Sequence, residues 1–212
     1  VSYKFLSYLT GEEVYAPESV VSREEPSYGS AISTTLRSSY ETLSASQVQS
    51  MPNISIRKKE KWGFEGYSTI NHDYNLKTIG YVAIGDTIEV HVEVVVDNAT
   101  GLMWMRAGNG NYLEWDEAQK WVTKLNQLGY AGYQDWRLPT LEEAASLLES
   151  NKRDALYIDP VFSRRQDGCW TGDKKSEFSV WHVDFEVGSI SFVPGSALFG
   201  ISSFARPVRS VK

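Results

Sequence analysis

Residues 129–140 read Gly-Tyr-Ala-Gly-Tyr-Gln-Asp-Trp-Arg-Leu-Pro-Thr, and this block joins two segments whose apolar residues recur at helical intervals. The first segment covers residues 115–128, and the glycine that follows it is typical of a helix C-terminus. In the second segment, Thr140 and Glu143 fit a capping box at the start of a helix that ends at Glu149. The sequence therefore predicts two main helices connected by this block.

Short strand patterns surround the two helices. Residues 81–84 and 87–96 flank Gly85-Asp86, and the second run alternates apolar with polar residues, so we predict a β-hairpin. Further strands are predicted at residues 178–186, 190–193 and 204–208. Helices inserted among short antiparallel strands indicate an α+β fold rather than a repeated strand-helix-strand unit.

The chain divides into three parts by composition. Residues 1–35 are rich in serine, glutamate and tyrosine, and we predict an N-terminal extension that covers the body or reaches a neighbouring molecule. Residues 36–96 hold the hairpin and a short helix, which Ser44 and Gln47 begin as a capping box. Residues 97–212 form the main domain and contain six of the seven tryptophans.

Composition and charge exclude several classes of protein. Hydrophobic residues make up 42% and charged residues 23% of the 212 residues, which is typical of a globular protein. No apolar run approaches the length of about 18 residues that a membrane span needs, so we expect no membrane insertion. A net charge of -6 opposes binding to phosphate backbones, so we expect no nucleic acid partner. The basic run at residues 57–61 is interpreted as a solvated loop or strand edge.

Residues that could support catalysis are sparse. Cys169 is the single cysteine, so an intrachain disulfide and a cysteine-built metal cluster are both excluded. His182 and Asp184 share one face of a predicted strand, but such a pair supplies only two of the three or four ligands that zinc requires. His91 stands between two glutamates, where a solvated strand face explains the pattern. We therefore predict a protein that is not an enzyme and needs no cofactor.

Calcium is the metal that the sequence leaves open. Asp97, Asn98 and the turn at residues 108–111 offer oxygen donors close together in the chain, although the regular spacing of an EF-hand loop is absent. The metal ligands therefore stay unassigned.

The stretch between residues 163 and 203 is predicted to form long polar loops, where ligand recognition is commonly placed. Arginine pairs offer bidentate donors to carboxylate or sulfate groups, and an exposed aromatic ring offers a stacking face. We assign ligand binding to Arg164, Arg165, Lys174, Lys175, Glu177 and Phe199. Plain solvated loops are the alternative interpretation of the same residues.

The main domain carries a series of sequence blocks in a fixed order. They are Asp-Asn-Ala-Thr-Gly-Leu-Met-Trp at 97–104, Trp-Asp-Glu-Ala at 115–118, Asp-Trp-Arg-Leu-Pro-Thr at 135–140, Cys-Trp-Thr at 169–171, Trp-His-Val-Asp-Phe-Glu-Val-Gly at 181–188 and Val-Arg at 208–209. In order and spacing these blocks resemble the DUF1566 family, the C-terminal domain of the Legionella collagen-like adhesin. The Asp-Trp-Arg-Leu-Pro-Thr block is the most specific of them.

The resemblance implies a C-type-lectin-like fold related to the formylglycine-generating enzyme, in a secreted or cell-surface protein of a bacterium. The adhesin relative forms trimers and binds sulfated glycans, so we expect an exported protein whose signal has been removed and which forms a homo-oligomer. The reactive cysteine pair of the oxidase relatives and the calcium-sugar motifs of animal C-type lectins are both missing here.

Several residues of the blocks are assigned to the fold rather than to a ligand. We expect Trp104, Trp136 and Trp170 to be core anchors, because buried tryptophans contribute large apolar surfaces. Arg137 would then be a partly buried cation paired with a carboxylate such as Asp135. Relatives often carry cysteines where Val122 and Pro207 stand, so the disulfide that the resemblance implies is lost in this chain.

Two functions follow from these observations. The first is a non-enzymatic extracellular recognition or adhesion module that binds a glycan or protein ligand through its late loops. The alternative is a structural subunit of a bacterial surface appendage or filament, in which residues 1–35 add a strand to a neighbour.

Overall fold

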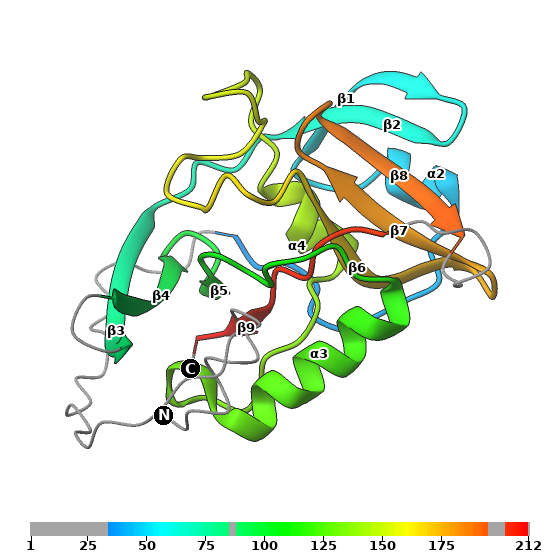
Figure 1. The fold of residues 1–212 in the computed structure, drawn as a ribbon. Helices are drawn as coiled ribbons and strands as arrows, with labels where there is room; N and C mark the ends of the chain where they lie inside the picture. The colour runs from blue at the N-terminus through cyan, green and yellow to red at the C-terminus, as the bar shows by residue number, and fades with distance from the viewer. Residues whose placement is uncertain (1–33, 85–87, 195–201, 212) are drawn as a thin grey trace.

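The computed structural model describes residues 34–84, 88–194 and 202–211 (Figure 1). The strands in this part of the chain are β1 (Ile54–Glu60), β2 (Gly63–Ser68), β3 (Tyr74–Ile84), β4 (Ile88–Asp97), β5 (Leu102–Met105), β6 (Gly168–Ser176), β7 (Ser179–Asp184), β8 (Ser189–Pro194) and β9 (Val208–Ser210). They form a first sheet of order β1-β2-β8-β7-β6 and a second of order β3-β4-β5-β9, with antiparallel neighbours throughout.

The helices of the described residues are α2 (Ala45–Gln49), α3 (Trp115–Leu128) and α4 (Leu141–Ser146), with a 3-10 turn at Tyr130–Gly132. Helices among short antiparallel strands confirm the predicted α+β class, whereas the likeness to C-type lectins stays a prediction. Among the described residues, none of the helices combines the length and the hydropathy that a membrane span requires.

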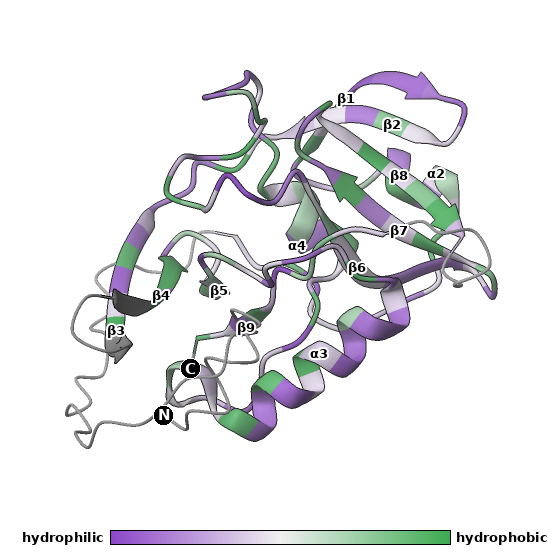
Figure 2. Cartoon of the chain, in the orientation of Figure 1, coloured by the Kyte–Doolittle hydropathy of each residue, from purple (hydrophilic) through white to green (hydrophobic). Residues whose placement is uncertain are grey.

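The two main helices follow the predicted capping signals. Helix α3 has the predicted bounds and ends on Gly129, whose φ of 66° is the left-handed conformation that glycine adopts without strain. Figure 2 shows hydrophilic and hydrophobic residues alternating along α3, as expected of a helix that buries one face. The Thr140 hydroxyl begins α4 by accepting from the Glu143 N–H, and both groups of the predicted capping box are present.

Helix α4 is shorter than predicted, because it ends at Ser146 rather than at Glu149. The next residues are still buried, since Leu147 and Leu148 are 2% and 1% exposed. The Glu149 N–H, however, bonds to the carbonyl of Tyr157 at 3.0 Å and not to the helix. The helical spacing of apolar residues in the sequence therefore extends beyond the last residue of the helix.

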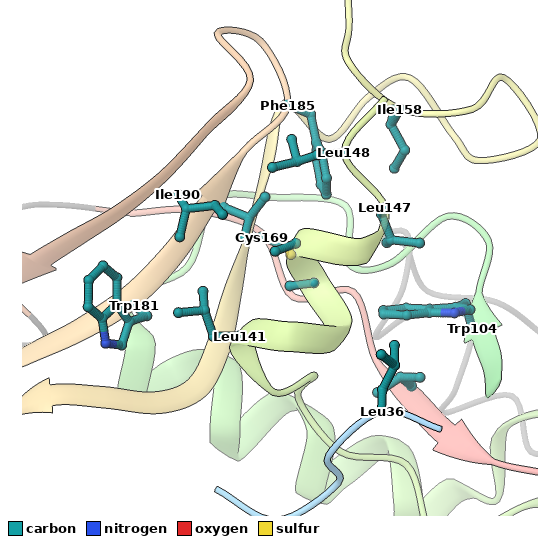
Figure 3. Packing of buried hydrophobic residues seen from close by; sticks show 14 of the residues in the cluster. Leu36, Trp104, Leu141, Leu147, Leu148, Ile158, Cys169, Trp181, Phe185 and Ile190 are labelled. Carbon is teal, nitrogen blue, oxygen red and sulfur yellow. The ribbon is translucent and has the colours of Figure 1, made fainter. Parts of the chain in front are cut away.

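The buried side chains gather in two clusters. In the first, Leu141 and Leu147 lie with Trp181 and Ile190 of the first sheet (Figure 3). The second gathers beside α3 and includes Trp121 and Trp136 with parts of β4 and β5. The predicted core anchors are confirmed, because Trp104 and Trp170 are fully buried and Trp136 is 2% exposed.

Two strand predictions need correction. The chain end was predicted as a strand over residues 204–208, but β9 begins at Val208. The carbonyls of Phe204, Ala205 and Pro207 accept from three separate segments, so these residues form no continuous ladder. Residues 168–176 were predicted as part of the polar loops, but they form β6. The register shifts of this strand interrupt the alternation of apolar and polar residues that marks a strand in the sequence.

Arg137 pairs with a different carboxylate from the one predicted. Its two terminal nitrogens each lie 2.6 Å from an oxygen of Glu143, which is fully buried in the first turn of α4. Asp135 instead accepts from Arg209, with an Nε to Oδ1 distance of 2.7 Å. The capping box decides the pairing, because it already holds the Glu143 carboxylate beside the start of α4.

Residues 36–43, which we call the strap, lie along the outer edge of β6. The Leu43 N–H bonds to the carbonyl of Lys174 at 2.8 Å, and the Lys174 N–H bonds to the carbonyl of Glu41 at 3.0 Å. Thr42 and Lys174 thereby form a parallel bridge. Most of the predicted extension, residues 1–33, lies outside the described residues, and the predicted division into three parts stays a prediction.

Candidate ligand-binding site

A shallow hollow of about 360 Å³ lies between the strap, the start of α3 and the edge strand β6. Its walls combine two aromatic rings with an amine, a carboxylate, an amide and a hydroxyl. The lining residues are Tyr40, Glu41, Thr42, Trp115, Gln119, Gly172 and Lys174. The hollow is open to solvent, and it places several polar groups beside two aromatic rings.

Trp115 and Lys174 form one side of the hollow. Trp115 is the first residue of α3, and its indole N–H donates to the carbonyl of Thr171 at 2.8 Å, which fixes the ring against β6. The ammonium nitrogen of Lys174 lies 5.1 Å from the centre of the indole ring, within the range of a cation–π interaction. The ammonium group is therefore held over an aromatic face.

Tyr40 lines the hollow from the strap. Its hydroxyl donates to the carbonyl of Leu138 at 2.9 Å, and 48% of the residue is exposed. Partial burial raises the pKa of the Tyr40 phenol to about 12, so the hydroxyl stays protonated and keeps donating. The ring covers Gly172, where an added Cβ would lie 2.1 Å from the Tyr40 Cε1 atom.

A buried carboxylate holds the strap against the site. Asp173 is fully buried and accepts from both terminal nitrogens of Arg37, at 3.0 and 2.6 Å. It also accepts from the backbone N–H groups of Glu41 and Leu141, each at 2.6 Å. One side chain of β6 therefore joins the strap to the first residue of α4.

The start of α4 adds further contacts to the strap. The Thr140 hydroxyl donates to the carbonyl of Arg37 at 2.9 Å. In return, the Arg37 N–H donates to the carboxylate of Glu142 at 3.2 Å. The two bonds pair the backbone carbonyl and N–H of Arg37 with side chains at the start of α4, so they hold the strap against this helix.

The structure divides the predicted site residues between distant places. Lys174 and Lys175 lie on β6 rather than in a loop. They face opposite ways, since Lys174 lies over the Trp115 ring, whereas the Lys175 ammonium nitrogen lies 5.5 Å from the ring centre of Phe192. Glu177 is exposed in the turn after β6. Phe199 lies outside the described residues.

The predicted arginines are exposed in the loop before β6, and Arg164 pairs with Asp154. Both arginines precede Gly168 at the beginning of β6, and neither is among the residues that line the hollow. Of the predicted site residues that the structure describes, only Lys174 lines the hollow. The assignment of ligand binding to the whole predicted set stays a prediction.

Sequence reasoning missed Tyr40, Gln119 and Trp115 as site residues. Trp115 was assigned to the apolar face of its helix, and its place at the first position of that helix is the signal that could have singled it out. Tyr40 carried no such signal, because its approach to Gly172 depends on contacts between residues far apart in the chain.

The weak catalytic candidates are engaged inside the fold. Burial raises the pKa of the Cys169 thiol to about 12 and lowers that of His182 to about 4. The His182 Nε2 atom contacts the Ser203 hydroxyl at 2.9 Å, whereas Asp184 accepts from the backbone of the following turn. Among the described residues, no group of three or more histidine, cysteine or acidic side chains could hold a metal.

The residues considered for calcium also bond to protein groups. Asp97 is fully buried and accepts from the hydroxyl of Thr100 at 2.5 Å and from the N–H groups of Asp73 and Ala99. The side-chain oxygen of Asn109 accepts from the Ala205 N–H at 2.6 Å. The two carboxylate oxygens of Asp97 and the amide oxygen of Asn109 thus face donors of the fold, while calcium binding itself stays a prediction that no observation tests.

Cys169 should resist alkylation in the native protein. With a pKa near 12, the thiol is protonated at pH 8, and complete burial blocks access to it. We expect iodoacetamide to leave the native chain unmodified and to modify it fully in denaturant, as read by intact mass. Rapid modification under native conditions would show a reactive cysteine and revive an enzymatic interpretation.

The fold and the hollow together define an α+β module with an open hollow on its surface. Residues 93–209 match the Lcl C-terminal domain family, and the chain belongs to this family. The match confirms the resemblance inferred from the sequence blocks. A search of curated proteins finds no match to the chain.

Proposed function

We propose that this protein is a non-enzymatic extracellular recognition module that binds an acidic glycan in the hollow between Tyr40, Trp115 and Lys174. The observation that carries the proposal is the pairing of two aromatic rings with an ammonium group in one open hollow. Membership of the Lcl C-terminal domain family supports an adhesion-related role at a cell surface.

The chemistry of the hollow suits a sugar that bears a sulfate or carboxylate. Aromatic rings offer flat apolar faces on which the C–H face of a sugar ring can pack. Lys174 provides a point charge for the anionic group, and Gln119 can both donate and accept hydrogen bonds to hydroxyls. The ligand class therefore follows from the combination of groups rather than from any one of them.

The shallowness of the hollow favours weak binding by each copy. Adhesion to a surface compensates for weak single sites when several copies bind at once, because each later contact forms at high effective concentration. A homo-oligomer displayed outside the cell would use the hollow in this way. The oligomer and the surface location are parts of the proposal.

Trp115→Ala should lower the affinity for heparin-derived oligosaccharides about tenfold or more, because a central aromatic anchor of this kind contributes about 1.4 kcal/mol or more. Lys174→Gln should lower it by a similar factor. Lys175→Gln is the matched control, since this neighbour has the same charge but lies over Phe192 on the other face of β6. Titration calorimetry measures all three variants.

The result that would contradict the proposal concerns Arg164 and Arg165. If Arg164→Gln with Arg165→Gln abolished binding while Trp115→Ala left it unchanged, the site would lie in the loop before β6 and the proposal would be wrong. The appendage alternative depends on residues 1–35, and no observation on the described residues favours it over recognition.

A further inference from the structure

One wall of the hollow comes from outside the segment that defines the family. Residues 93–209 match the family and include Trp115, Gly172 and Lys174, whereas the strap precedes the match by some fifty residues. We propose that the strap determines which glycan the hollow accepts, with Tyr40 and Glu41 as specificity residues and Arg37 as a positioning residue. This inference rests on the proposed function of the hollow.

The strap is held in place more firmly than an exposed segment requires. Within it, Arg37 forms a bidentate ion pair with Asp173, and the N–H of Glu41 bonds to the same carboxylate. At the far end, the indole N–H of Trp181 donates to the carbonyl of Leu43 at 3.1 Å. Contacts at both ends fix the residues between them, and these are the residues that face the hollow.

The absence of a side chain at Gly172 makes room for the Tyr40 ring. The three atoms that an added Cβ would approach most closely all belong to the Tyr40 ring, at 2.1 to 2.4 Å. Gly172 is absent from the glycines with positive φ, so its backbone conformation alone does not exclude a side chain. Gly172, which lies in the family segment, therefore leaves the space that the Tyr40 ring of the strap occupies.

Glu41 gives the strap a second influence on the ligand. Among the residues that line the hollow, Glu41 is the acid and Lys174 is the base. The Glu41 carboxylate opposes anionic groups and accepts hydrogen bonds from hydroxyls, so it limits how strongly charged the preferred sugar is. A different residue at this position would change the choice of glycan while the rest of the domain stayed the same.

Gly172→Ala tests the wall without truncating any side chain that lines the hollow. The new methyl group displaces the Tyr40 ring, so we expect about tenfold weaker binding of heparin-derived oligosaccharides, the scale of a lost aromatic anchor. Tyr40→Phe should bind nearly as wild type, because the ring is kept, whereas Tyr40→Ala should bind as weakly as Gly172→Ala. In the Tyr40→Ala background, adding Gly172→Ala should cause no further loss of affinity.

Glu41→Gln tests the choice of ligand. Affinities are measured for three kinds of oligosaccharide: heparin-derived ones, which carry sulfates and carboxylates, hyaluronan, which carries carboxylates alone, and laminarin, which is neutral. We expect the preference for the sulfated over the neutral probe to rise about threefold or more, the scale of one removed like-charge contact. Glu186→Gln is the control for net charge, because Glu186 is exposed in the turn after β7.

Arg37→Lys tests positioning, since it keeps the charge but loses the paired donors that hold the strap. Binding should weaken as in Tyr40→Ala while the urea midpoint shows a folded chain. The outcomes separate the two proposals. Unchanged binding in Gly172→Ala and Tyr40→Ala, with binding lost in Trp115→Ala, would overturn the role of the strap alone. Full binding by Trp115→Ala would overturn the proposed function, and with it the inference about the strap that rests on it.

Discussion

Replacing Asp173 by asparagine is expected to lower the free energy of unfolding by about 3 kcal/mol, because it removes one partner of a buried ion pair. Asp173 is fully buried and accepts from Arg37 twice, from Glu41 and from Leu141. The amide has one acceptor oxygen for these donors, and its own N–H groups would face them. A chain of this size should lose about 10 °C in Tm.

Urea unfolding followed by tryptophan fluorescence measures this loss. Asp116→Asn is the matched control, because this aspartate is exposed in the first turn of α3 and should change stability by less than about 0.5 kcal/mol. An Arg37→Met and Asp173→Asn double variant should be less destabilised than the sum of the two single variants. Strict additivity would show that the two side chains do not act as a pair.

Trp170→Ala should be at least as severe, with a loss of about 3–5 kcal/mol in the free energy of unfolding. The side chain is fully buried in the second cluster, and its indole N–H donates to the carbonyl of Leu113 at 2.7 Å. The substitution leaves a cavity and removes one of the two hydrogen bonds that the Leu113 carbonyl accepts, the other coming from the Ser203 N–H. Differential scanning calorimetry should find the midpoint lowered by about 10 °C or more.

Trp62→Ala provides the comparison, because Trp62 is 58% exposed beyond the end of β1. Its removal should cost far less than that of Trp170. Equal losses in the two variants would mean that burial does not govern the contribution of tryptophan to this fold, and the assignment of Trp170 to the core would have to be withdrawn.

The parts of the fold that were predictable depend on neighbours in sequence. Gly129 ends α3 and Thr140 begins α4 through local backbone geometry, so their positions could be inferred from the residues alone. Edge strand β1 carries the basic run that was read as a loop or strand edge, and it appears hydrophilic in Figure 2. Charged side chains on an edge oppose pairing with other chains.

The parts that escaped prediction depend on contacts between distant residues. Strand β6 was hidden because register shifts around Lys174 disturb the alternation of apolar and polar residues. The choice of Arg137 between Asp135 and Glu143 was settled by the capping box, which nearness in sequence does not reveal. Local patterns indicate which elements form, but not which side chains those elements bring together.

The candidate site illustrates the same limit. Lys174 was found because its charge marked it, whereas Tyr40 and Trp115 looked like ordinary aromatic residues of a strand or helix. Their juxtaposition requires the strap to lie along β6, which in turn depends on the ion pair between Arg37 and Asp173. A site built across such sequence distances becomes visible only in the folded chain.

The recognition of a glycan at the hollow is tested most directly by the indole N–H signal of Trp115 in nuclear magnetic resonance spectra. Heparin-derived oligosaccharides are titrated into ¹⁵N-labelled protein, with the signal assigned through Trp115→Phe. We expect the Trp115 signal to shift progressively to saturation while that of Trp62 stays in place. An unmoved Trp115 signal, with shifts confined to the backbone of Arg164 and Arg165, would contradict the account.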